Sequence, residues 1–242
     1  MVSEWPERFS AHASGSLNPG GSAARLFTIG HSNHDPEAFL NLLRRAEISA
    51  VADVRSLPSS MRHPHFNRPE LEGFLKHQGI TYVFLGDFLG GRPQQPSLYD
   101  VDGRVDYERV RKMPFFEQGL ERLIKGQDQY RIALVCAEED PLHCHRGLMI
   151  APALVERGLA PVHLRGDGSM ETTEDLEKRL FAETKVGAGI LDGLFASTIS
   201  PEDRKRLLAD AYRDMARRKG FRRRPDTQPA ADFREEIDDF GE

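Results

Sequence analysis

The segment VCAEEDPLHCHRG brings thiols, imidazoles and carboxyl groups together within a short stretch of chain. It contains both cysteines of the protein, Cys136 and Cys144, together with Glu138 and His145. A thiol beside an imidazole can become an activated nucleophile, and a carboxyl group can transfer protons to and from a substrate. The segment therefore predicts an acid–base or nucleophilic site, with these four residues as catalytic candidates.

Three other uses of the same residues remain open. Cys136, Cys144 and His145 could bind a metal ion, although the spacing of the cysteines is not one of the usual short zinc spacings. The two thiols could form a redox pair, although a Cys-x-x-Cys motif is the stronger signal for that chemistry. The cysteines could also be buried apolar fillers, with His145 and Arg146 bracing a loop. The nucleophilic interpretation is preferred here, so no residue is assigned as a metal ligand and no cofactor is named.

Five short apolar runs predict the strands that must position this segment. They are continuously apolar, which is typical of strands covered on both faces. Helical patterns alternate with them, so we predict an α/β fold with a five-stranded, mainly parallel, Rossmann-like sheet and helices on both faces. The predicted strands are residues 25–30, 49–54, 81–86, 131–137 and 160–166.

Two of the predicted helices carry clear local signals. Asn67 and Glu70 stand three residues apart, which predicts a capping pair for a helix over residues 69–77. A second helical pattern covers about residues 107–125 and should break near Pro114, because proline cannot donate a backbone hydrogen bond.

The helix that follows the reactive segment is predicted to begin inside it. Asp140 and Pro141 are typical of an N-cap and a first helical residue, and Pro152 should bend the helix further along. This start would place three side chains in the first helical turns, namely Cys144, His145 and Arg146. A helix N-terminus attracts anions and lowers the pKa of a thiol, and Arg146 would add a bidentate donor for an anion.

The carboxyl ends of the parallel strands should form the ligand crevice. His31 and Ser32 follow the first strand, and Asp53 and Arg55 stand at the end of the second. His31 and Asp53 join the catalytic candidates, whereas Ser32 and Arg55 are candidates for substrate binding. Asp53 and Arg55 leave an extended strand on the same face, so they either pair with each other or hold a ribose hydroxyl and a phosphate.

A long polar loop after the second strand contains further cations. Arg62, Asn67 and Arg68 lie in or beside it, together with Phe66. Cations interleaved with an aromatic ring could grip a phosphate backbone and stack a base. We favour a different role, in which the loop is a lid that supplies positive charge to a small anionic ligand.

Four motifs of the chain, in this order and spacing, resemble a known family. They are FTIGHSN, VADVRSLPSSMRHPHFNRPEL, GITYVFLGDFLGG and LVCAEEDPLHCHRG. The chain resembles the DUF488 family over about residues 25–165, above all in Cys-Ala-Glu followed by Cys-His-Arg. The family has no assigned function, so the resemblance implies a shared fold and site without implying a reaction.

The composition and charge of the chain exclude several classes of protein. The chain has 242 residues, of which 39% are hydrophobic, and a net charge of −5, so the whole molecule is not built to be drawn to nucleic acid. No run of eighteen apolar residues is present, and the N-terminus lacks the pattern of a secretory signal. With only two cysteines, the expected location is the reducing cytoplasm.

The predicted organisation has four parts. They are a flexible lead (1–24), the DUF488-like α/β domain (25–170), a helical extension (171–219) and a disordered charged tail (220–242). The predicted function is an enzyme, a hydrolase or group transferase, that acts on an anionic substrate such as a nucleotide or a nucleic-acid derivative. The rival from another class is a module that binds a nucleotide or nucleic acid without turning it over. A small anionic ligand is the expected partner, nucleic acid is the alternative, and no membrane is expected.

Overall fold

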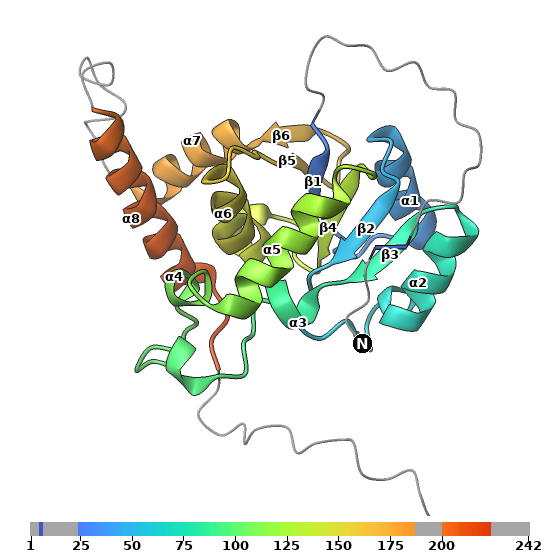
Figure 1. Ribbon diagram of the computed structural model, residues 1–242, viewed down its shortest axis with the longest axis horizontal. Helices are drawn as coiled ribbons and strands as arrows, with labels where there is room; N and C mark the ends of the chain where they lie inside the picture. The colour runs from blue at the N-terminus through green and yellow to red at the C-terminus, as the bar shows by residue number, and fades with distance from the viewer. Residues whose placement is uncertain (1–4, 7–23, 187–199, 224–242) are drawn as a thin grey trace, which may run out of the picture.

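The computed structural model describes residues 5–6, 24–186 and 200–223. It is an α/β structure built on one sheet, mainly parallel, with helices on both faces, as predicted (Figure 1). The strands lie in the order β3-β2-β4-β1-β5-β6. Their bounds are β1 (Leu26–Gly30), β2 (Ala50–Asp53), β3 (Thr81–Phe84), β4 (Ile132–Cys136), β5 (Val162–Leu164) and β6 (Met170–Thr172).

The prediction of five strands was wrong by one. β6 pairs antiparallel with β5 and forms the edge of the sheet, with Val162 opposite Thr172. It is only three residues long and partly exposed, so it lacks the apolar run that identified the other strands. The Rossmann-like description also fits only roughly, because β4 lies between β1 and β2, whereas the classic order has β1 next to β2.

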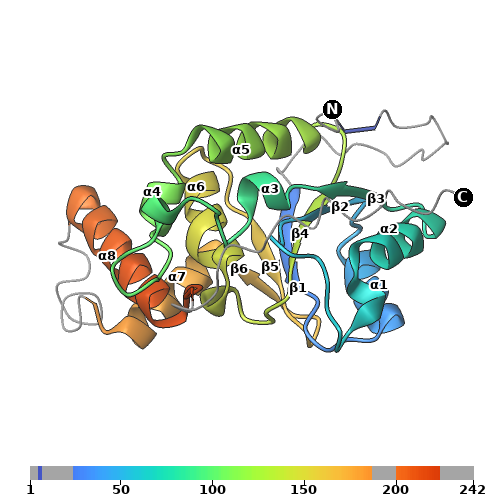
Figure 2. The same ribbon diagram turned by 90° about the horizontal axis from the view of Figure 1, so that it is seen from below.

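The longer helices divide between the two faces of the sheet. Figure 2 shows α1 and α2 on one side of the sheet and α5 and α6 on the other. The α-helices are α1 (Pro36–Arg45), α2 (Arg68–His77), α3 (Gly86–Leu89), α4 (Tyr107–Val110), α5 (Pro114–Gly126), α6 (Ala151–Val155), α7 (Thr173–Thr184) and α8 (Pro201–Lys219). Shorter helical turns are η1 (Pro64–Phe66), η2 (Pro96–Leu98), η3 (Pro141–His143) and the π-helical η4 (Arg146–Ile150).

Each face of the sheet has its own apolar core. Phe39 and Leu71, from α1 and α2, pack with Val135 of β4 in one core. Leu120 of α5 and Leu154 of α6 pack in the other, which also contains the Cys136 side chain. Alternate residues of β4 therefore serve opposite cores, as the two-residue period of a strand requires. The predicted break at Pro114 is confirmed, because α4 ends at Val110 and α5 begins at the proline.

The chain on both sides of the predicted domain also contacts it. Trp5 stacks on Tyr130 with ring centroids 5.4 Å apart, and its indole nitrogen donates to the backbone oxygen of Arg122 at 2.7 Å. After α8, Phe221 accepts a hydrogen bond from the Val105 backbone nitrogen at 3.0 Å. Most of the predicted lead and most of the predicted tail lie outside the described residues. Of the described helices, none contains an apolar stretch of the length that a membrane span requires.

The path of the chain creates a crevice at the end of β4. Helices α1 and α2 follow β1 and β2 on one face, whereas the chain leaving β4 passes to α6 on the other face. β4 lies between β1 and β2, so the connections from neighbouring strands separate at its carboxyl end. This is a topological switch point, where open α/β sheets bind their ligands.

Candidate functional site

Cys136, the last residue of β4, lies on the floor of a cavity of about 260 Å³. The carbonyl oxygen of this residue accepts a hydrogen bond from the His31 backbone nitrogen at 2.8 Å, which ties the end of β4 to the end of β1. The cavity lining also includes Glu138, Cys144 and His145. A larger cavity of about 590 Å³ is lined by residues of α4, α6, α7 and α8, but neither cysteine nor histidine contributes to it.

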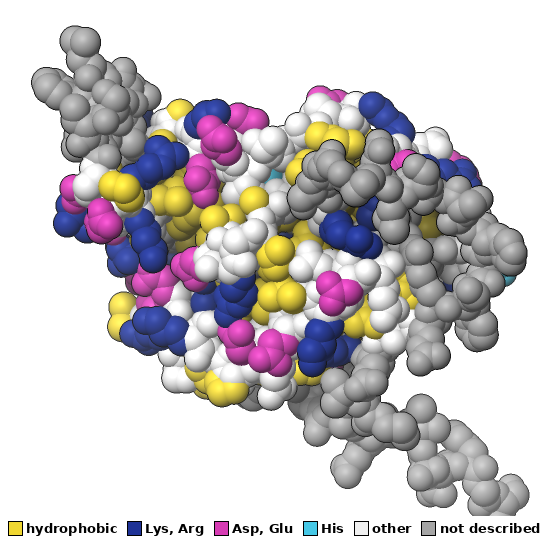
Figure 3. Space-filling model, turned by 45° about the horizontal axis from the view of Figure 1, so that its top comes forward, with side chains coloured by type: hydrophobic (Ala, Val, Ile, Leu, Met, Phe, Trp, Pro, Cys, Tyr) yellow, Lys and Arg dark blue, Asp and Glu magenta, His cyan; other side chains and the backbone are white. Residues whose placement is uncertain are grey.

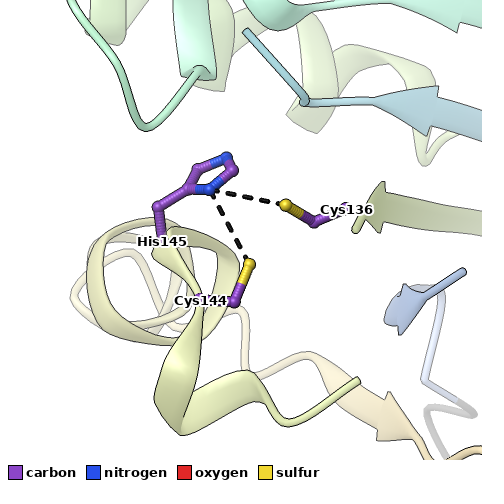
Figure 4. A group of neighbouring side chains, drawn as sticks. All are labelled: Cys136, Cys144 and His145. Atoms are coloured by element: carbon purple, nitrogen blue, oxygen red, sulfur yellow. Dashed lines mark hydrogen bonds between the residues drawn. The ribbon is translucent and has the colours of Figure 1, made fainter. Parts of the chain in front are cut away.

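The two thiols converge on one ring nitrogen (Figure 4). His145 Nδ1 lies 3.6 Å from Cys136 Sγ and 3.7 Å from Cys144 Sγ. The other ring nitrogen, Nε2, lies 2.9 Å from the backbone oxygen of Val54. A carbonyl oxygen can only accept, so Nε2 carries the hydrogen and the neutral ring presents the Nδ1 lone pair to both sulfurs.

A break in the helix places Cys144 in this group. Asp140 accepts from the Leu142 backbone nitrogen and caps a turn that ends at His143, and Cys144 is then extended, with φ −139° and ψ 145°. The predicted helix start at Pro141 was therefore wrong, because Cys144 is extended, whereas His145 and Arg146 stand at the start of the next helical segment. The turn closes after three residues, and the next helical segment, η4, begins only at Arg146.

The electrostatics of the two thiols differ. Burial, a hydrogen bond with Cys144 and the nearby Glu138 carboxylate raise the pKa of Cys136. Burial also opposes ionisation of Cys144, but contacts with Cys136, Arg146 and His145 outweigh it and lower the pKa of that thiol. Burial opposes protonation of His145 as well, yet the sulfur of Cys144 raises the pKa of the imidazole. Cys144 is thus the sulfur on which negative charge is best stabilised.

Glu138 is the carboxyl group of the site. Cys136 Sγ donates to Glu138 Oε2 at 3.0 Å. The residue is exposed through the open side of the cavity, yet the walls around the carboxyl group, with Cys144 nearby, raise its pKa. A carboxyl group that is both accessible and partly enclosed is suited to proton transfer.

One family of proteins matches the part of the chain that contains this site. The model of a family described as a domain of unknown function, DUF488, matches residues 35–151. Residues 35–151 belong to the DUF488 family. No curated protein and no solved structure matches the chain. The DUF488 match contains Cys136, Glu138, Cys144 and His145, whereas β1, β5 and helices α7 and α8 lie outside it.

Arg146 of the DUF488 domain lies behind the reactive segment and is fully buried. Its guanidinium donates to the backbone oxygens of Glu138 and Glu139, and its Nε donates to Thr28 Oγ1 at 3.3 Å. It does not line the cavity. In this arrangement Arg146 holds the loop that carries Glu138, which is the bracing use that the sequence left open.

Asp53 and Arg55 of the DUF488 domain pair with each other, which is one of the two alternatives that the sequence allowed. Arg55 Nε donates to Asp53 Oδ1 at 2.9 Å, and Tyr82 donates to Asp53 Oδ2 at 2.8 Å. Asp53 is completely buried, whereas Arg55 still reaches the lining of the cavity. The pair therefore fixes one wall of the site.

The other predicted residues are not brought to the cavity lining. His31 is buried against Phe66, with ring centroids 4.3 Å apart, and burial lowers its pKa to about 4. Ser32 has a positive φ of 46° in the turn that follows β1. The Arg62 side chain is exposed on the loop after β2.

The start of α2 also differs from its prediction. The guanidinium of Arg68 lies 4.4 Å from the centre of the Phe84 ring, outside the cavity lining. Asn67 occupies the N-cap position of α2, as predicted, but its side chain forms no capping hydrogen bond. Its side-chain oxygen instead accepts from the Ser60 backbone nitrogen at 2.6 Å and closes the loop.

Sequence reasoning missed the residues at the cavity mouth. Arg92, His143 and Lys219 line the cavity and are exposed. The guanidinium of Arg92 lies 4.6 Å from the centre of the Phe221 ring, which also lines the cavity. The sequence contained one signal for this part of the cavity, namely the glycine at position 91, directly before Arg92. A Cβ at Gly91 would lie 2.6 Å from His145 Cγ, so only glycine permits this approach.

Proposed function

We propose that this protein is an enzyme, a hydrolase or group transferase, that acts on an anionic substrate in the cavity over the end of β4. One observation carries the proposal. A carboxyl group, an imidazole and two thiols meet on the floor of the cavity, and the residues at its mouth are basic. Titratable groups that converge in a crevice at a switch point are the default signature of an active site.

The charge of the lining supports an anionic substrate. Arg55, Arg92 and Lys219 contribute positive groups, and Glu138 is the one carboxylate among the described lining residues. Arg92 and Lys219 form no ion pair with a carboxylate in the described part of the chain, so their charge is available to a ligand. The small volume, about 260 Å³, suits a small molecule or the reactive end of a larger one.

Glu138 is the best candidate for the proton-transfer step. In hydrolysis, the carboxylate takes a proton from the attacking water while the water oxygen bonds to the electrophilic centre of the substrate. The protonated carboxyl then delivers that proton to the leaving group, which returns Glu138 to its starting state. In group transfer, an acceptor hydroxyl or amine replaces the water.

A matched pair of glutamate variants tests the proposal. Purified protein is incubated with a panel of phosphate esters, nucleotides and other small anions, and product formation is followed by mass spectrometry. Glu138→Gln should lower the rate by about 10²–10⁴-fold, whereas Glu139→Gln should retain it, because Glu139 bonds to Arg165 at 2.9 Å and lies outside the cavity lining. Full turnover by Glu138→Gln would refute the role of this carboxyl group.

The same panel separates an enzyme from a binding module. A binder would retain an anion without product, and its affinity would survive in Glu138→Gln. A nucleic-acid binder would in addition lose affinity steeply as salt concentration rises. On the face seen in Figure 3, Lys and Arg side chains of the described residues are interspersed with Asp and Glu, which favours a local anion site over a broad nucleic-acid surface on that face.

A further inference from the structure

We propose that Cys136, Cys144 and His145 bind one zinc ion, whose fourth coordination position faces the cavity beside Glu138. The binding of the ion stands on the geometry of three side chains. The catalytic use of the ion rests on the proposed function, since it gives the cavity floor the means to activate water.

The distances between the donor atoms fit a tetrahedral ion. Zinc bonds to sulfur at about 2.3 Å and to nitrogen at about 2.0–2.1 Å, so a tetrahedral angle separates sulfur and nitrogen by about 3.6 Å. His145 Nδ1 lies 3.6 Å from one sulfur and 3.7 Å from the other. All three donor atoms lie within 4.8 Å of one another, and all three residues are buried (Figure 4).

The donor types select the metal. Two thiolates and an imidazole suit zinc, whereas magnesium and calcium prefer oxygen ligands. A single ion can be reached from adjacent residues here because the extended backbone of Cys144 is followed by a helical residue, His145, so both side chains turn to one point. Cys136 approaches the same point from the end of β4.

The surroundings orient these donors as a metal site requires. His145 Nε2 donates to the Val54 carbonyl oxygen at 2.9 Å, which leaves Nδ1 free to coordinate. The Arg146 backbone nitrogen donates to Cys144 Sγ at 3.5 Å, a contact that stabilises a thiolate. With both sulfurs ionised, Glu138 and Arg146 cancel each other, and the remaining charge of −2 is that which a divalent ion neutralises.

Within the described residues, only three protein donors surround the proposed ion, which is typical of a catalytic zinc site and not of a structural one. Structural zinc sites have four protein ligands, whereas catalytic sites have three and leave the fourth position to water. Glu138 lies 3.0 Å from Cys136 Sγ and stands outside the set of three donors. A zinc ion with one histidine and two cysteine ligands, and a separate glutamate as acid and base, is an arrangement that activates water in zinc deaminases.

The test is metal binding by the full chain. Protein purified under reducing conditions is stripped with a chelator and titrated with zinc, and the zinc content is then measured. Cobalt(II) is added in a parallel titration. We expect one ion per chain, and with cobalt a thiolate-to-metal absorption band together with the visible bands of a tetrahedral site. Cys136→Ser and Cys144→Ser should each weaken binding by at least about 100-fold.

Two control variants make the outcome specific. His143→Ala should bind zinc as the wild type does, because this exposed histidine lines the cavity without belonging to the donor set. Glu138→Gln should also bind zinc while losing turnover. Absence of stoichiometric zinc in the reduced wild type, or cobalt spectra without a thiolate band, would overturn the inference even if a cysteine variant failed to fold.

The two proposals fail separately in this design. Zinc binding by a protein that turns over none of the anions would keep the metal site and remove the proposed function. Turnover that depends on Glu138 in a metal-free protein would keep the function and remove the metal site.

Discussion

The end of β1 lies against the loop that carries Glu138, and this close approach predicts the effect of adding one methyl group at Gly30. Gly30 ends β1 beside Cys136. A Cβ at this position would lie 1.9 Å from the backbone oxygen of Glu138 and 2.8 Å from the Cα of Glu139. A carbon atom in favourable contact lies about 3.5–4.0 Å from its neighbour. Both distances fall short of this range, so Gly30→Ala requires the loop or the strand to move by roughly 1 Å or more.

The obstacle cannot rotate away, because it is backbone. The Glu138 carbonyl is also held from the other side by the buried guanidinium of Arg146. Overpacking of a rigid interior costs about 1–3 kcal/mol, and the constraint on this loop places Gly30→Ala at the upper end, at about 3 kcal/mol of lost stability. The displaced Glu138 should also lower the turnover that the proposed function assigns to it.

A second glycine provides the matched control. Gly73 lies within α2, and a Cβ there would have no neighbour within 4 Å. Gly73→Ala should therefore raise stability by about 0.5–1 kcal/mol, the ordinary gain of alanine over glycine in a helix. Urea unfolding followed by circular dichroism measures both variants. A Gly30→Ala protein within about 0.5 kcal/mol of the wild type, the level of an ordinary surface substitution, would refute the reasoning.

Two further predictions concern buried groups. Arg146→Met should lower stability by about 2–6 kcal/mol, because two partly buried carbonyl oxygens lose their donor at about 1–3 kcal/mol each. Arg157→Met, which removes a partly exposed arginine that bonds to Ala153 and Glu117, should cost less than about 1 kcal/mol; equal losses would contradict a special role for Arg146. His163 is held neutral, since burial and then the charge of Arg146 lower its pKa to about 3. The unfolded chain takes up this proton near pH 6.5. The stability linked to His163 is therefore fully present above that pH and is lost as the pH falls toward 3. The loss should approach about 1.4 kcal/mol per pH unit, and His163→Gln should remove that slope in unfolding experiments between pH 6 and 4; parallel curves would contradict it.

Much of the sheet could be predicted because its strands are buried on both faces. Residues 132–136 are uniformly apolar in the sequence and all buried in the structure, so the apolar pattern directly predicted the strand. β6 follows no such rule. Its three residues are partly exposed and are held by pairing with β5. A strand that depends on its neighbour and contributes little to the core leaves no apolar period to detect.

The residues on the cavity floor could be predicted, whereas those at its mouth could not. Cys136, Glu138, Cys144 and His145 lie close together in the chain, so their types alone indicated a shared purpose. Their geometry depends on the extended conformation of Cys144, which local helix signals did not predict. The mouth depends on contacts between distant segments, such as Arg92 with Phe221, which local patterns do not encode.

The origin of the residues at the cavity mouth has an evolutionary consequence. The floor residues belong to the segment that matches the DUF488 family, whereas Lys219 and Phe221 come from chain far beyond it. If the proposed function is right, part of the substrate-binding mouth is thus encoded far from the reactive residues, while Arg92 and His143 of the same mouth lie inside the match. A lineage could exchange the last turn of α8 and the residues after it, and so acquire a new substrate preference, while inheriting the reactive group unchanged.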